Sequence, residues 1–189
     1  MTCATGTRFQ RDTAVHPLEG GRFAVRLDEG SAGPYPAAAR YAEQPAPQVP
    51  LPEALTPLPP DPGAASISHR VELRLALGAA PFAGDEAHTG GWARLAEPGP
   101  PDLPTVALFT DIWWPASWPR LERLSPAPTV DLTIHFRAPL PPDAGPWVLG
   151  EFRSPTARDG YVDGDARLWL PDGTLLAQAR QLALLLPGG

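Results

Sequence analysis

The feature that most constrains this fold is an apolar segment from Leu103 to about Trp114, which the sequence predicts to be a helix. Its hydrophobic residues occupy every side of a helical wheel, and a helix of that kind is buried. Asp102 is suited to cap its N-terminus, Pro104 to occupy its first turn, and Pro115 to end it. The rest of the chain must therefore enclose one helix.

Asp111 is the one charged residue of this segment. A carboxylate near a helix C-terminus opposes the macrodipole, and apolar surroundings oppose its hydration. Because neither local structure nor packing rewards an aspartate here, Asp111 is the first candidate functional residue. The alternative is a structural carboxylate that is satisfied by backbone donors, by Arg120 or by Arg123.

Composition excludes several classes of function. The chain has 189 residues, 43% of them hydrophobic, which is enough for one compact domain with an extension. Its net charge of −6 is spread along the sequence, so no nucleic-acid partner is expected. The lone cysteine gives no disulfide framework, and the four histidines lack ligand spacing, so neither a metal nor a cofactor is expected.

The sequence shows no signal for a membrane. No apolar run reaches the roughly 18 residues that a membrane span needs. The N-terminus lacks the basic and then apolar pattern of a signal peptide. We therefore expect no membrane span and a cytoplasmic location.

The chain divides into three parts by composition. Within residues 1–30, the runs Thr13 to Pro17 and Arg22 to Leu27 flank a Gly-Gly pair, which predicts a hairpin. Residues 31–65 contain ten prolines and almost no periodic hydrophobicity, which predicts a semi-extended linker laid over a surface. Residues 66–187 carry the periodic patterns of a domain.

Parts of that domain's sequence alternate between hydrophobic and polar residues, as the strands of a half-buried sheet do. Hydrophobic residues alternate with polar ones over 71–77 and 130–136, and further strands are predicted over 91–95, 147–153, 166–170 and 175–186. On the last strand, small residues share one face with a single amide, that of Gln181. The order is two strands, a helix and a four-stranded meander, which predicts an α+β fold in which one antiparallel sheet wraps around one buried helix.

The segments LFTDIWWPASWPRL, APTVDLTIHFRAPLP and the closing LLAQARQ resemble the C-terminal half of TesB-like acyl-CoA thioesterases over residues 66–187. That family has two fused hot-dog folds and hydrolyses acyl-CoA thioesters. It uses an aspartate on the second hot-dog helix, a threonine or serine at the start of the next strand, and a glutamine on the last strand to hold a hydrolytic water. The resemblance assigns these roles to Asp111, Thr129 and Gln181.

Each of these residues also has an ordinary structural interpretation. Thr129 is a common choice at the start of a strand, and Gln181 could bond to a sheet edge or a loop. Aromatic residues of the helical segment, Trp113 and Trp114 among them, line either an acyl channel or a plain core. Three arginines are candidate contacts for CoA phosphates: Arg137, Arg153 and Arg158.

The chain departs from the family pattern in one respect. Residues 1–30 resemble the opening strands of a first hot dog. Judged by the usual size of a domain, roughly seventy to eighty further residues of that first hot dog are missing. Because the family's tunnel lies between two hot dogs, activity implies a homodimer whose sheets pair edge to edge. The alternative is a non-catalytic acyl-binding or acyl-CoA-binding module or a degenerate partner subunit. A related dehydratase would need a histidine and aspartate pair, which is not evident.

Overall fold

The computed structural model describes residues 13–18, 22–27, 45–59, 66–97 and 99–187. The chain forms two compact units, Met1–Glu43 and Gln44–Gly189. In the first unit, strands β1 (Thr13–Leu18) and β2 (Arg22–Leu27) pair antiparallel, which confirms the predicted hairpin. The division into 1–30, 31–65 and 66–187 stays a prediction.

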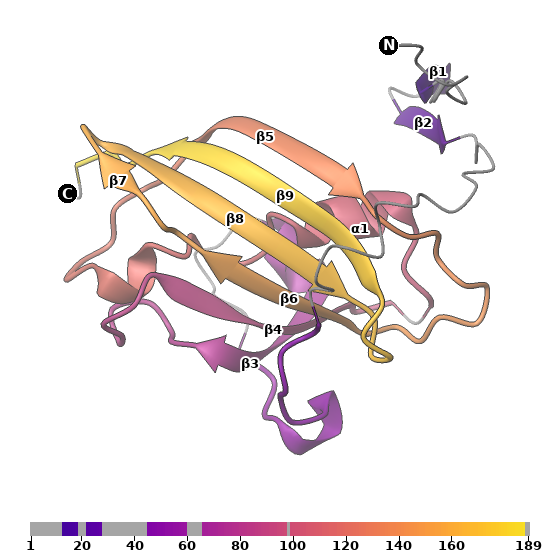
Figure 1. Cartoon of the computed structure of the whole chain (residues 1–189), viewed down its shortest axis with the longest axis horizontal. Coiled ribbons are helices and arrows are strands. Elements are labelled where there is room, and N and C mark those ends of the chain that lie inside the picture. Colours follow the sequence, from indigo (N-terminus) through magenta and orange to yellow (C-terminus); the bar gives the residue numbers. More distant parts are fainter. Residues whose placement is uncertain (1–12, 19–21, 28–44, 60–65, 98, 188–189) are drawn as a thin grey trace, which may run out of the picture. The chain divides into compact units, whose positions relative to one another are not determined.

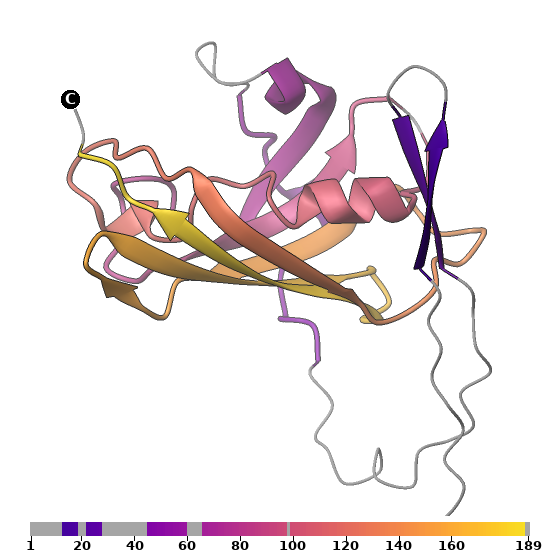
Figure 2. The same ribbon diagram turned by 90° about the horizontal axis from the view of Figure 1, so that it is seen from above.

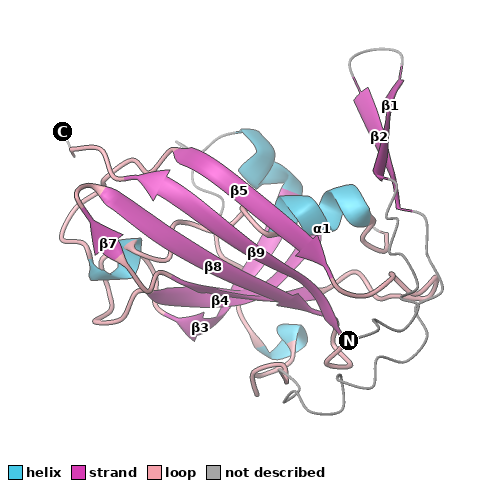
Figure 3. Cartoon of the chain, turned by 45° about the horizontal axis from the view of Figure 1, so that its top comes forward, coloured by secondary structure: helices cyan, strands magenta, loops and turns pink. Residues whose placement is uncertain are grey.

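The second unit is built on one seven-stranded antiparallel sheet (Figures 1 and 3). Six strands follow the order β3-β4-β6-β8-β9-β5, and β7 pairs with β8 beside this path. The strands are β3 (Val71–Gly78), β4 (His88–Leu95), β5 (Thr129–Phe136), β6 (Val148–Arg153), β7 (Ala157–Arg158), β8 (Tyr161–Trp169) and β9 (Leu175–Leu184).

The prediction of a four-stranded meander after the helix is wrong. Strand β5 does not pair with β6, which follows it in sequence, but with β9, the last strand. The residues of β5 alternate as those of any half-buried strand do, and alternation does not say which strand lies alongside. The consequence is that β5 forms one edge of the sheet and β3 forms the other.

Helix α1 (Leu103–Phe109) lies against one face of the sheet, as Figure 2 shows, and the sheet curls around it. Asp102 caps the helix as predicted, since its Oδ1 accepts a hydrogen bond of 2.8 Å from the backbone N–H of Thr105. Val106 and Phe109 are each 1% exposed. They pack with the inward residues of β6, β8 and β9 in the main core, among them Val148, Leu168 and Ala177.

The helix is shorter than the sequence indicated. It ends at Phe109, whereas the apolar pattern predicted an end near Trp114. The Thr110 hydroxyl donates to the carbonyl of Ala107 at 2.7 Å, and the Thr110 N–H donates to the same carbonyl. The last turn is therefore of the tighter 3-10 type, and the helix ends there. Asp111 therefore follows the helix rather than belonging to it.

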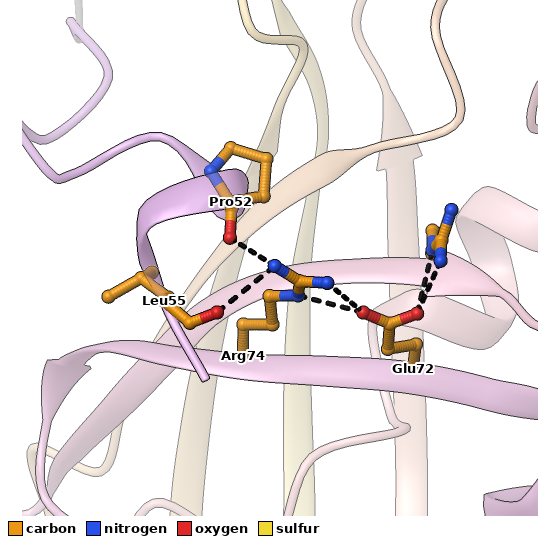
Figure 4. A network of polar contacts seen from close by, with 5 residues as sticks. Pro52, Leu55, Glu72 and Arg74 are labelled. Carbon is orange, nitrogen blue, oxygen red and sulfur yellow. Dashed lines mark hydrogen bonds and ion pairs between the residues drawn. The ribbon is translucent and has the colours of Figure 1, made fainter. Parts of the chain in front are cut away.

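A segment of the predicted linker, residues 45–59, lies on the outer face of the sheet; we call it the strap. It contains the short 3-10 helix η2 (Pro52–Ala54). The Arg74 guanidinium on β3 donates to the carbonyls of Pro52 and Leu55, as Figure 4 shows, and also to the carboxylate of Glu72. The Trp92 indole N–H donates to the carbonyl of Pro50 at 2.9 Å.

The strap covers a second, smaller core on that outer face. Its buried members are three tryptophans and a leucine, against which Val49 and Leu55 of the strap pack: Trp92, Trp147, Leu149 and Trp169. The guanidinium carbons of Arg74 and Arg94 lie 5.0 and 4.8 Å from the ring centroid of Trp147. The helix thus covers one face of the sheet and the strap covers part of the other.

Candidate active site

The three residues assigned by resemblance converge at one place. Asp111 lies in a bend just after α1, Thr129 is the first residue of β5, and Gln181 lies on β9. Because β5 and β9 are paired, with Leu132 opposite Gln181, the two strands bring Thr129 close to the Gln181 side chain. Figure 1 shows β5 and β9 side by side.

Gln181 connects the other two residues. Its side-chain Nε2 donates to Oδ1 of Asp111 at 2.9 Å and to Oγ1 of Thr129 at 2.5 Å. A primary amide has two N–H donors, and here each has its own acceptor. The hydroxyl of Thr129, which accepts from Gln181, keeps its own hydrogen to donate. Oδ2 of Asp111 has no hydrogen-bond partner among the described residues.

The environment raises the pKa of Asp111 above the ordinary value of 3.8 for an aspartate, because the surrounding protein reduces the hydration of the carboxylate. The hydrogen bond from Gln181 acts in the opposite direction and lowers this pKa. No arginine forms an ion pair with Asp111 in the described part of the chain, so Arg120 and Arg123 do not satisfy it there. The carboxylate is held by an amide instead.

A pocket of about 490 Å³ adjoins these residues, between the segment after α1 and the inner face of the sheet. Asp111, Thr129 and Gln181 line it on the polar side. Four aromatic residues line it elsewhere: Trp113, Trp114, Trp118 and Phe152. The Trp113 ring packs against two of them, with centroids 5.2 Å from Trp114 and 6.0 Å from Phe152.

This arrangement places a hydrogen-bond acceptor and a hydroxyl at the wall of an apolar hollow. Such a hollow accepts an alkyl or aryl group, while its polar wall can hold a water molecule. A carboxylate within reach of that water can remove its proton, provided that it is ionised. The trio contains no serine or cysteine nucleophile, and its carboxylate can support general-base assistance.

The polar wall is open to solvent. Asp111 and Thr129 are exposed, and Gln181 is half-buried. Strand β5, where Thr129 lies, has a strand neighbour on one side only, and Val130 is 58% exposed. The carboxylate, the hydroxyl and a free sheet edge therefore share one surface.

The three arginines that the sequence suggested for CoA phosphates already have partners. Arg137 donates to Gln178, Arg153 to the carboxylate of Glu151, and Arg158 lies 3.4 Å from the carboxylate of Asp159. Of these arginines, Arg153 also lines the pocket.

Sequence reasoning missed parts of the pocket wall. Phe152 lies on β6 in a buried run without alternating polarity, so the sequence did not show on which face of the sheet its side chain lies. Phe82 has a left-handed backbone with φ of 64° and stacks on Trp118, which lines the pocket, with ring centroids 6.5 Å apart. A positive φ at a phenylalanine has no signal in the sequence.

In the described part of the chain, no helix is both long enough and apolar enough to cross a membrane.

The structure resembles solved proteins with the hot-dog fold. A conserved protein of unknown function with a hot-dog fold from Alicyclobacillus acidocaldarius is 25% identical, has a TM-score of 0.73, and is matched over 91% of this chain and 66% of its own. Acyl-CoA thioesterase II TesB2 from Mycobacterium marinum is 17% identical, with a TM-score of 0.59 over 91% of this chain and 67% of its own. The tesB protein of Mycobacterium avium subsp. paratuberculosis is 17% identical, with a TM-score of 0.60 over 78% and 56%.

These neighbours confirm the predicted α+β hot-dog fold. The chain spans about two thirds or less of the length of each of them. Among curated proteins, none matches this sequence significantly. The model of the acyl-CoA thioesterase C-terminal domain matches residues 51–185, which is more than two thirds of the chain. The fold and this match agree with the resemblance read from the sequence, and the chain belongs to the family of acyl-CoA thioesterase C-terminal domains.

Proposed function

We propose that this protein hydrolyses fatty acyl-CoA thioesters to the free acid and CoA, with Asp111, Thr129 and Gln181 as its catalytic residues. Membership of the thioesterase family supports the reaction class. The observation that carries the site assignment is the Gln181 amide, which donates to both Asp111 and Thr129 at the wall of a pocket that is lined elsewhere by aromatic residues.

The roles follow from the donors and acceptors present. Asp111 accepts a proton from a water molecule as the water oxygen attacks the thioester carbonyl carbon. The Thr129 hydroxyl and the Gln181 amide orient the water and the carboxylate for that attack. The tetrahedral intermediate then collapses, the C–S bond breaks, and the proton held by Asp111 passes to the leaving thiolate. The products are a carboxylic acid and CoA thiol, and Asp111 is again ionised.

The exposure of the site leads us to include a second copy of the chain in the proposal. A general base that faces bulk water does not exclude solvent or enclose an acyl chain. The free edge of β5 offers unpaired backbone groups beside Thr129, which an identical edge can pair with in a symmetric dimer. The homodimer would cover Asp111 and Thr129. The cytoplasmic location expected from the sequence stays a prediction.

The test is release of CoA from short, medium and long acyl-CoA substrates by the purified protein and by Asp111→Asn. We expect the wild type to turn over and the variant to lose about 10²- to 10⁴-fold in kcat, which is the usual contribution of a general base. Asp143→Asn, which replaces an exposed loop carboxylate outside the pocket, is the matched control and should keep full activity.

Two results would count against the proposal. If Asp111→Asn hydrolyses thioesters as fast as the wild type, Asp111 is not the base. If the wild type releases no CoA from any substrate but binds acyl-CoA, the protein is a non-catalytic acyl-CoA-binding module.

A further inference from the structure

A second hollow, of about 480 Å³, lies beside the candidate active site. One wall runs from Arg120, the last residue of the 3-10 helix η4 (Trp118–Arg120), through Arg123 to Ser125. The other wall is residues 185–187, which follow β9. The sequence suggested Arg120 and Arg123 only as possible partners of Asp111.

The charges of this hollow are uncompensated. Arg120 and Arg123 are exposed, and within the described residues neither forms an ion pair. Glu122 is the acidic residue of the lining, so the hollow keeps one net positive charge in a chain whose net charge is −6. By contrast, Arg153 and Arg180 lie 2.9 and 3.3 Å from carboxylate oxygens.

The hollow and the catalytic pocket share a wall. Ser125 lines the hollow, and the next residue, Pro126, lines the pocket. Hydrogen bonds fix this wall: the Trp118 indole N–H donates to the Ser125 carbonyl at 2.9 Å, and the Leu186 N–H donates to the Pro126 carbonyl at 2.8 Å. A ligand that leaves the pocket over Ser125 and Pro126 therefore enters the hollow that Arg120 and Arg123 line.

We infer that this hollow binds the phosphate groups of the nucleotide end of CoA through Arg120 and Arg123. The inference rests on the proposed function, because the pocket would hold the acyl group and the thioester. The CoA molecule continues from its thioester sulfur through an uncharged arm to an adenosine that carries three phosphates. Guanidinium groups bind phosphate oxygens bidentately and stay charged at any working pH, which suits them to this role.

The experiment measures binding of adenosine 3′,5′-bisphosphate by calorimetry to the wild type and to the double variant Arg120→Gln/Arg123→Gln. We expect affinity to fall about 10- to 100-fold, the usual effect of losing two hydrogen-bonded charges at an exposed site. Arg180→Gln removes an arginine outside both hollows and should bind as the wild type does. Arg120→Lys/Arg123→Lys keeps the charge and should lie between the wild type and the glutamine variant.

A kinetic measurement separates this inference from the proposed function. The glutamine double variant should raise KM for acyl-CoA and leave kcat/KM for the same acyl group on pantetheine unchanged, because pantetheine lacks the nucleotide. If the wild type hydrolyses no thioester but binds the bisphosphate through the two arginines, the proposed function fails and the subsite stands. Equal binding by the wild type and the glutamine variant, or no binding by either, would overturn the subsite.

Discussion

At the scale of single residues, the proposed chemical role of Asp111 comes with an expected cost in stability. Its pKa in the folded protein is raised above the ordinary value of 3.8, because the surrounding protein reduces the hydration of the carboxylate even though the residue is exposed. A raised pKa means that the folded state favours the protonated carboxyl. The corresponding stabilisation is fully present below pH 3.8 and is lost as pH rises through the folded pKa. At neutral pH the ionised carboxylate therefore opposes folding.

We accordingly expect Asp111→Asn to raise Tm at pH 7 while it lowers activity. Asparagine keeps an oxygen that can accept from Gln181 but carries no charge to desolvate. The difference in Tm should shrink as pH falls through the raised pKa of the folded state, and it should be lost below 3.8, where the aspartate is neutral in both states. Thermal unfolding followed by circular dichroism across this range checks the prediction. A lower Tm for the variant at pH 7 would show that the ionised form stabilises the fold.

Gln181 provides a second prediction, because its hydrogen bond lowers the pKa of Asp111. For Gln181→Leu, the pKa of Asp111 should rise further, so the acidic limb of the pH profile of kcat/KM should move to higher pH. We also expect kcat to fall about 10²-fold, since misplacing a catalytic group by about 1 Å has an effect of that size. Gln48→Leu, an exposed amide of the strap, is the control. Superimposable acidic limbs would exclude this role for Gln181.

At the scale of elements, the sequence predicted what depends on local pattern. Alternation identified β3 and β5, and the N-cap aspartate with the following proline identified the start of α1. The end of α1 was misplaced because the apolar pattern continues through Ile112 to Trp114, whereas the Thr110 hydroxyl stops the helix. The place of β5 in the sheet depends on a partner far away in sequence, which no local pattern records.

For the candidate site too, the sequence predicted one part and could not predict another. The roles of Asp111, Thr129 and Gln181 were predicted by resemblance. The hydrogen bond from Gln181 to Thr129 follows from the pairing of β5 with β9, whereas the one to Asp111 depends on where the chain runs after α1. The hollow at Arg120 and Arg123 was not predicted, because the sequence does not show that residues 185–187 return beside them.

The strap gives a prediction at this scale. Arg74→Met removes the donors to the carbonyls of Pro52 and Leu55, so the strap should detach more often. Cleavage after Glu53 by a glutamate-specific protease should then be about tenfold faster, given roughly 1.4 kcal/mol of lost hydrogen bonding. The control is Arg180→Met, which replaces an arginine on β9 instead of β3 and should be cleaved at the wild-type rate. Equal cleavage of Arg74→Met and wild type would mean that the other contacts of the strap, such as the hydrogen bond from Trp92 to Pro50, hold it without Arg74.

At the scale of the whole molecule, the proposed dimer depends on the edge of β5. Val130 is 58% exposed on that strand, and a charge there should prevent edge pairing. We expect light scattering to give twice the chain mass for the wild type and the single chain mass for Val130→Lys, with loss of thioesterase activity. Ile67→Lys places the same charge on an exposed residue of the 3-10 helix η3 (Ser66–Arg70) and should leave the dimer intact. A monomeric wild type with full activity would refute the dimer.

The attachment of the strap also bears on which changes the chain tolerates over evolution. Arg74 and Trp92 bind main-chain carbonyls of the strap, two of which belong to prolines, and every residue type has such a carbonyl. Replacements of exposed strap side chains such as Gln48 leave these acceptors in place. An inserted or deleted residue instead shifts the carbonyls along the sheet, so this stretch can drift in sequence but is fixed in length.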